Sequence, residues 1–206
     1  MGISRALIRR VEKTVHGFTD IQNAAEEVSV SHNKAETLLL AKDLFASDIH
    51  QARMLATFLF GTLAAESKES FTILRKRVSQ DKDWRVQEIL AQAFDRYCKD
   101  NGYEKSLPDI KDWLKDENPN VRRAVTEGLR IWTTRDYFRE HPEVAIRLLS
   151  QLRADESEYV RKSVGNALRD ISRKHKGLIQ IELKKWDTSN KHIQQTYKLA
   201  SKFLKG

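Results

Sequence analysis

The 206-residue chain has only one cysteine, three prolines and eight glycines. A single cysteine, Cys98, excludes an internal disulfide and suits a reducing compartment. Hairpins and tight turns need proline and glycine, so their scarcity favours long helices joined by short connections. No apolar run reaches the roughly 18 residues of a membrane-spanning helix, and the start "MGISRALIRRVEKTVHG" lacks the apolar core of a secretory signal. We therefore expect a cytoplasmic protein with no membrane partner.

Acidic residues are outnumbered by basic ones, 29 to 37, which gives a formal net charge of +8. Such a balance favours a polyanionic partner, nucleic acid first, because basic side chains release the counterions of phosphates. The six histidines are scattered without the paired spacing of a metal site. No glycine-rich phosphate loop or nucleophile elbow occurs either. We expect no metal and no organic cofactor.

A repeat runs through most of the chain. The stretches "KDWRVQEILAQAFDRYC", "NPNVRRAVTEGLRIW" and "SEYVRKSVGNALRDISRKH" share one layout, anchored on Val86, Val121 and Val160. Weaker copies are anchored on Ile49 and Ile193, so the period is between 33 and 39 residues. Periods of this length are typical of stacked helical pairs, as in HEAT repeats.

The predicted fold is all-α, a right-handed α-α superhelix (solenoid) of HEAT-like helical repeats. It forms a single domain over residues 1–206, with N-terminal helices over about 1–45 and repeats over 46–206. Amphipathic helices at 69–78, 107–114 and 143–152 are the expected first helices of the pairs. Asn118 before Pro119, and Ser157 before Glu158, are helix-start signals for the second helices.

The expected second helices carry basic residues at equivalent positions. The middle copy has Arg122, Arg123 and Arg130 off its apolar stripe. The next copy has Arg161, Lys162, Asn166 and Arg169 at the matching face, and the preceding copy has Gln87, Glu88, Gln92 and Asp95. A concave face of this kind could follow a duplex backbone. The alternative is an ordinary solvated face, in which Glu127 pairs with Arg123 and Arg130.

The motifs "WRVQE", "NPNVRRAVTEGLR" and "DESEYVRKSVGNALRDISRKH" resemble the HEAT-like DNA alkylation-repair glycosylases, the AlkC and AlkD group, and lie closer to the AlkC branch. The resemblance implies a C-shaped helical solenoid that holds double-stranded DNA in a concave basic cleft. It implies excision of cationic N3- or N7-alkylated bases by a monomer without a cofactor.

Residue by residue, the resemblance implies three reactive positions. Trp84 matches a tryptophan that packs on the deoxyribose of the lesion, and Glu88 an acidic residue beside its anomeric carbon. Glu127 matches the acidic residue of a "SEG" turn, here "TEG". The DNA-binding set that we expect is Arg122, Arg123, Arg130, Trp132, Arg161, Lys162, Asn166 and Arg169.

The chain also departs from the family pattern. After its "TEG" turn it lacks the prolines of the AlkC branch, and Asn166 stands where the AlkD branch has an aromatic residue. Three functions therefore stay open: an alkylbase DNA glycosylase, a catalytically silent nucleic-acid binder with the same repeats, and a protein-interaction scaffold. Glu88 separates the first two, because a carboxylate facing phosphates gives a pure binder no advantage.

Overall fold

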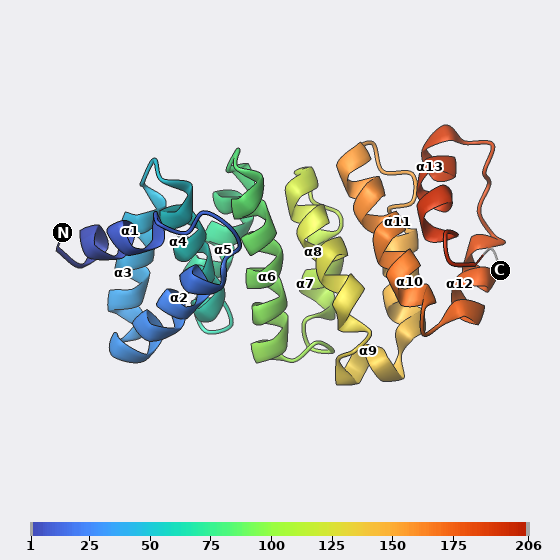
Figure 1. The fold of residues 1–206 in the computed structure, drawn as a ribbon. Coiled ribbons are helices and arrows are strands. Elements are labelled where there is room, and N and C mark those ends of the chain that lie inside the picture. Colours follow the sequence, from blue (N-terminus) through green and yellow to red (C-terminus); the bar gives the residue numbers. More distant parts are fainter. Residues whose placement is uncertain (1, 205–206) are drawn as a thin grey trace. The chain divides into compact units, whose positions relative to one another are not determined.

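The computed structural model describes residues 2–204, and every regular element in that range is helical (Figure 1). The chain forms two compact units, Met1–Asn101 and Gly102–Gly206. The helices of the first unit are α1 (Gly2–Val11), α2 (Thr19–Ser31), α3 (Lys34–Phe45), α4 (His50–Leu63), α5 (Lys68–Lys76) and α6 (Trp84–Asn101), with a 3-10 turn, η1 (Val78–Gln80). Those of the second are α7 (Leu107–Trp113), α8 (Pro119–Trp132), α9 (Asp136–Glu140), α10 (Pro142–Ser150), α11 (Glu158–Ser172), α12 (Lys176–Leu183) and α13 (Lys191–Ala200). The predicted all-α repeat fold is confirmed.

The helix starts follow the predicted capping residues. Asn118 caps α8 by accepting a hydrogen bond from the backbone N–H of Asn120, and proline is the first helical residue. Ser157 caps α11 by accepting from the N–H of Val160. The three helices expected at 69–78, 107–114 and 143–152 correspond to α5, α7 and α10.

In the first unit, α4 is the central helix and packs against α2, α3, α5 and α6. Its apolar residues are almost all buried, so it has no single solvent-facing side. α4 and α6 approach closely at Gly61, where a built Cβ atom would lie 2.7 Å from Cβ of Ala93. A glycine at this point lets two helix backbones meet.

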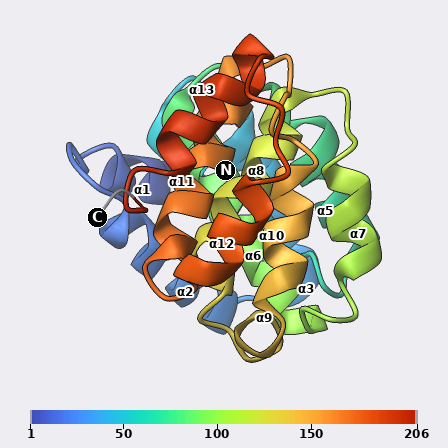
Figure 2. The same ribbon diagram turned by 90° about the vertical axis from the view of Figure 1, so that its right-hand side faces the viewer.

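In the second unit, α11 packs against α8, α12 and α13 (Figure 2). The hydroxyls of Thr126 on α8 and Ser163 on α11 lie 2.6 Å apart in the buried contact. At the C-terminal end of α8, Trp132 stacks on Phe138 with ring centroids 5.5 Å apart, and Tyr103 packs against both rings. Burying aromatic rings of this size stabilises the unit by roughly 1.5–3 kcal/mol each.

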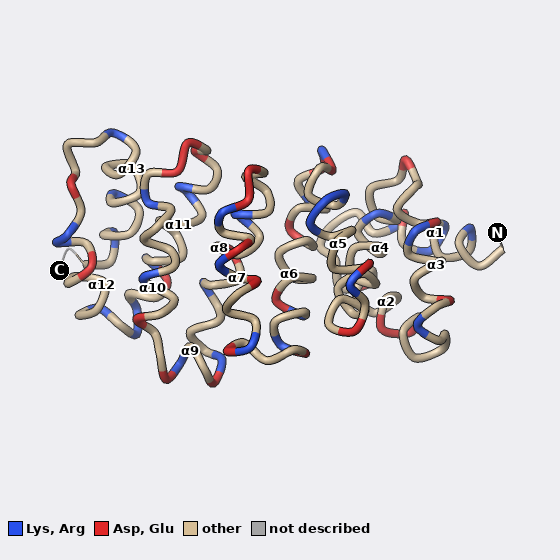
Figure 3. Tube along the Cα trace, turned by 180° about the vertical axis from the view of Figure 1, so that it is seen from behind, with Lys and Arg blue, Asp and Glu red and all other residues tan. Residues whose placement is uncertain are grey.

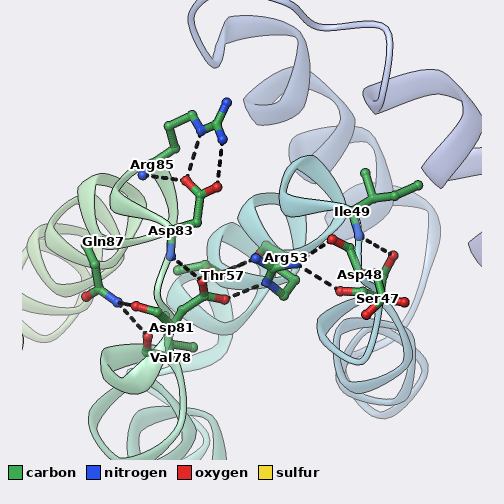
Figure 4. A network of polar contacts seen from close by, with 10 residues as sticks. All are labelled: Ser47, Asp48, Ile49, Arg53, Thr57, Val78, Asp81, Asp83, Arg85 and Gln87. Atoms are coloured by element: carbon green, nitrogen blue, oxygen red, sulfur yellow. Dashed lines mark hydrogen bonds and ion pairs between the residues drawn. The ribbon is translucent and has the colours of Figure 1, made fainter.

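Three second helices carry an arginine as their fourth residue, and we call Arg53, Arg122 and Arg161 the loop-binding arginines. Figure 4 shows the one in the first unit, Arg53 of α4. Its Nη1 donates to the carbonyl oxygens of Ser47 and Asp48 in the preceding loop, at 3.1 and 2.9 Å. Its Nε and Nη2 bind the buried carboxylate of Asp81, in the connection before α6, at 2.6 and 3.3 Å. One guanidinium thus joins the loops that precede α4 and α6.

Arg122 of α8 repeats this arrangement in the second unit. Its Nη1 donates to the carbonyl oxygens of Asp116 and Glu117, at 2.7 and 3.0 Å. Its Nε and Nη2 both lie 2.7 Å from the carboxylate oxygens of Asp155. The same donors are used as in α4, so the repeat extends to the level of single hydrogen bonds.

Arg161 of α11 completes the set. Its Nη1 donates to the carbonyl oxygens of Asp155 and Glu156, at 2.6 and 2.9 Å. Its Nε and Nη2 donate to the amide oxygen of Gln195 on α13, at 3.0 and 2.8 Å.

The loop-binding arginines correct the register of the first copy. Ile49 is the residue before α4, in extended conformation, whereas Val86, Val121 and Val160 are the third residues of their helices. The position in α4 that matches these valines is therefore Ala52. Under this register, the first residues of α4 and α6, His50 and Trp84, become equivalent.

Candidate functional site

The first unit contains a cavity of about 520 Å³. Three segments line it: residues 14–18 of the loop between α1 and α2, the first turn of α4, and the first turn of α6. α4 contributes His50, Gln51 and Met54, and α6 contributes Trp84, Arg85 and Glu88. The volume is in the range of small-ligand sites. Most of the exposed lining surface is apolar, although six of the eleven lining residues are polar or charged.

Trp84 and Glu88 lie one turn apart on α6 and both line this cavity. The buried face of α6 carries Val86, Ile89 and Leu90, so the helix turns Trp84 and Glu88 away from the core. Trp84 is 64% exposed, which is unusual for so large an apolar side chain. The structure therefore places Trp84 and Glu88, two of the predicted site residues, in the lining of the same cavity.

An ion pair fixes the start of α6 beside the cavity. Asp83 accepts from Nε and Nη2 of Arg85, at 2.9 and 2.7 Å, and from the backbone N–H of Arg85 at 2.9 Å (Figure 4). The Arg85 guanidinium carbon lies 5.8 Å from the Trp84 ring centroid. The hydrogen bonds from the Arg85 side chain lower the pKa of Asp83 to about 2, against the opposing effect of burial.

This lowered pKa predicts how acid affects stability. The folded-state pKa of Asp83 lies below its ordinary 3.8, so the ion pair stabilises the fold above pH 3.8 and its contribution is lost as the pH falls through about 2. We expect Asp83→Asn to lower the free energy of unfolding by about 1 kcal/mol at neutral pH, because Arg85 is partly exposed. Urea unfolding followed by circular dichroism at a series of pH values should show this difference shrinking in acid. A difference that stays constant with pH would contradict the role of Asp83.

The loop between α1 and α2 forms the remaining wall of the cavity. Gln51 of α4 holds it by donating to the carbonyl oxygens of Glu12 and Thr14, at 3.3 and 3.2 Å. Gly17 has a φ of +75°, a conformation that favours glycine, and Phe18 packs against Phe58 of α4. The loop is thus attached to α4 on both sides of its tip.

The other predicted site residues belong to the second unit, and there two of them have structural roles. Arg122 and Arg161 are loop-binding arginines, and Arg161 is only 5% exposed. Their guanidinium groups are engaged by loop carbonyls and by Asp155 or Gln195, as described above. This placement corrects the expectation that they face DNA.

Trp132 requires a similar correction. It is completely buried against Tyr103 and Phe138, so it presents no surface to a nucleic acid. The sequence contained the signal for this, because Trp132 follows Val125 by seven residues and Leu129 by three on the apolar stripe of α8.

Glu127 lies in a set of ion pairs on α8 and α11. Its carboxylate is 2.9 Å from Nη1 of Arg130 and 3.7 Å from Nη2 of Arg123, and Arg130 also binds Asp170 at 2.8 Å. Arg123 is buried and lies over the ring of Tyr159, 4.2 Å from its centroid. Figure 3 shows basic and acidic segments together on α8. The predicted pairing of Glu127 with Arg123 and Arg130 is thus present, but it involves a buried Arg123 and a half-buried Glu127 and not a solvated face.

The remaining predicted DNA contacts are on α11. Lys162 is exposed and pairs with Glu158 at 2.8 Å, Asn166 is half-buried, and Arg169 binds its neighbour Asp170 at 3.0 Å. Among these three, only Lys162 is largely exposed to solvent.

Sequence reasoning missed several residues of the cavity. His50 and Met54 occupy, one repeat earlier, the helix positions of Trp84 and Glu88. Aligning α4 on Ala52 instead of Ile49 would have identified both. Arg85 and the loop residues 14–18 carry no comparable signal, because the repeat does not extend to them.

Within residues 2–204, no helix is both long and apolar enough to cross a membrane. The same residues contain no cluster of three or more histidine, cysteine, aspartate or glutamate side chains suited to a metal ion.

A family model described as "DNA alkylation repair enzyme" matches residues 17–201. The chain belongs to this DNA alkylation repair family. It is 49% identical to AlkD2 from Streptococcus mutans, whose crystal structure covers 100% of this chain and 99% of its own length, with a TM-score of 0.97. A second structure from that organism, smu.31, is also 49% identical, covers 98% of both chains and has a TM-score of 0.91.

Two other relatives match this chain over different lengths. The structure of AlkC from Pseudomonas fluorescens, a glycosylase bound to DNA with an abasic site analogue, is 20% identical, covers 98% of this chain and 64% of its own, and has a TM-score of 0.53. The uncharacterised protein YhaZ of Bacillus subtilis is 33% identical over 105 residues. That match covers 49% of this chain and 29% of YhaZ, so it concerns only part of each protein.

Proposed function

We propose that this member of the alkylation repair family is an N-glycosylase that releases cationic N3- or N7-alkylated bases from double-stranded DNA. The observation that carries the proposal is the placement of Trp84 and Glu88 on one wall of the cavity. An exposed indole, a carboxylate and mainly apolar surroundings suit a planar cation better than a phosphate. We also propose that the protein acts on DNA as a monomer in the cytoplasm.

The chemistry needs little from the protein. An N3- or N7-alkylated purine already carries a positive charge, so the bond between the base and C1′ of the sugar breaks with its electron pair going to the base, which leaves neutral. The positive charge passes to an oxocarbenium-like sugar, and a water molecule then adds to C1′ and gives up a proton. In this proposal Glu88 stabilises the sugar cation and orients the water, while Trp84 packs against the deoxyribose.

Base release from methylated duplex DNA, scored by chromatography, tests the proposal. We expect Glu88→Gln to lower the rate about a hundredfold or more, because it removes a charge aimed at the transition state, and to leave DNA binding intact. Glu26→Gln is the matched control, since Glu26 is exposed on α2 away from the cavity lining. Equal rates for Glu88→Gln and the unaltered protein would remove Glu88 from the mechanism.

The second candidate is a nucleic-acid binder without excision. The engagement of Arg122, Arg130 and Arg161 by protein groups supports it, because fewer basic side chains are left for phosphates around a lesion. Salt-sensitive DNA binding without base release would establish this second function. Absence of both would favour a protein-interaction scaffold.

A further inference from the structure

His50 lines the cavity and would contact a ligand bound there. It is the first residue of α4, it is half-buried, and it lines the same cavity as Trp84, Glu88 and Met54. It also occupies the helix position that Trp84 has in the next repeat. The first turn of a helix is its positive end, which disfavours a protonated imidazole there.

The charged groups around His50 are mostly paired with one another. They come from four segments: Arg53 on α4, Asp81 and Asp83 before α6, Arg85 and Glu88 on α6, and His16 on the loop. Arg53 is bound to Asp81 and Arg85 to Asp83, each through two hydrogen bonds (Figure 4). Each pair is neutral overall, so the positive charge of its arginine offsets the effect of its carboxylate on the imidazole.

The protonation state of His50 follows from these surroundings. Burial lowers its pKa below the ordinary 6.5, and the nearby Arg85 and Arg53 add to this, whereas Asp83 and Asp81 act in the opposite direction. The lowered pKa favours the neutral imidazole. A neutral imidazole adds a hydrogen-bonding group to the cavity without adding positive charge.

We propose that His50 is a specificity-determining residue of the cavity: its neutral imidazole hydrogen-bonds the edge of a planar cationic ligand, and its protonation excludes that ligand by charge repulsion. This role of His50 rests on the proposed glycosylase function in one respect: that function supplies the class of ligand, a cationic aromatic ring. Every lining residue belongs to the first unit, and a small cationic ring without a DNA backbone tests this cavity directly.

The test uses the full chain and a permanently cationic probe, 1-methylnicotinamide, with uncharged nicotinamide for comparison. Binding is measured by calorimetry, and the ring protons of His50 are followed by NMR. We expect the cation to bind about tenfold more weakly at about pH 5 than at about pH 8, since a like charge then lies close to it. The bound cation should shift the titration of His50 to lower pH, and nicotinamide should show neither effect.

Three variants separate His50 from other titrating groups. His50→Gln keeps a hydrogen-bonding side chain but should remove the pH dependence, with His50→Asn as the replacement if it folds poorly by circular dichroism. His16→Gln should retain the pH dependence, and Glu88→Gln should weaken binding at both pH values while keeping their ratio. The inference would be overturned if the cation failed to bind at both pH values or bound equally well at both. It would also be overturned if binding to His50→Gln still depended on pH. Base release is scored separately, so loss of catalysis with retained His50-dependent binding would refute only the glycosylase.

Discussion

Replacing Arg122 with methionine is expected to lower the free energy of unfolding by about 3 kcal/mol, because it leaves a buried carboxylate without its cation. Asp155 is only 6% exposed and receives both Nε and Nη2 of Arg122. The carbonyl oxygens of Asp116 and Glu117 lose a donor in the same step. Chemical denaturation of the purified variant measures the effect.

Two further variants show whether the loss comes from this pairing. Lys162→Met removes an exposed cation of the same unit, whose pair with Glu158 is largely solvated, and should change stability by less than about 0.5 kcal/mol. Adding Asp155→Asn to Arg122→Met should cost less than the two single changes together, since the uncompensated charge is gone. If Arg122→Met instead weakened DNA binding with stability unchanged, its guanidinium would be a phosphate contact after all.

Replacing Gly61 with alanine should lower the free energy of unfolding by about 2 kcal/mol, because the added Cβ has no room. It would lie 2.7 Å from Cβ and 2.8 Å from Cα of Ala93, a backbone atom of α6 that can move only with its helix. Overpacking of this kind typically costs about 1–3 kcal/mol. Thermal and chemical denaturation give the magnitude, and Gly61→Val should be worse.

Gly177 provides the matched control for this substitution. It is also helical, in α12, but a Cβ built on it meets nothing within 4 Å. Gly177→Ala should therefore leave stability unchanged or raise it by up to about 1 kcal/mol through the lower entropy of the unfolded chain. Combining Gly61→Ala with Ala93→Gly should recover part of the loss. Equal effects at Gly61 and Gly177 would show that the α4–α6 contact can relax.

The sequence was sufficient to predict the helices because their signals are local. The caps Asn118 and Ser157 and the period-3.6 apolar stripes act within one or two turns, and the structure bears them out. The register of α4 was missed for a physical reason. Ile49 is apolar like the valines of the other repeats, but it lies in the extended residue before the helix, and only the contacts of Arg53 reveal the shift.

The candidate site was predictable only in part. Trp84 and Glu88 share a helix face, which four-residue spacing reveals. The arginines of the repeats were harder to interpret, since a surface cation and a cation that binds loop carbonyls look alike in sequence. Arg122 is held by Asp155, 33 residues further along, and no local pattern indicates such a partner. The opposite wall of the cavity, residues 14–18, comes from a loop outside the repeats.

The loop-binding arginines also determine where the chain can change length. Nη1 of Arg122 reaches carbonyl oxygens five and six residues back along the chain, and those of Arg53 and Arg161 do the same. A single inserted residue between the carbonyls and the helix would take both acceptors out of reach. We therefore expect the short segments between these carbonyl oxygens and the starts of α4, α8 and α11 to keep a fixed length. Insertions and deletions should be tolerated better in connections that no such arginine binds.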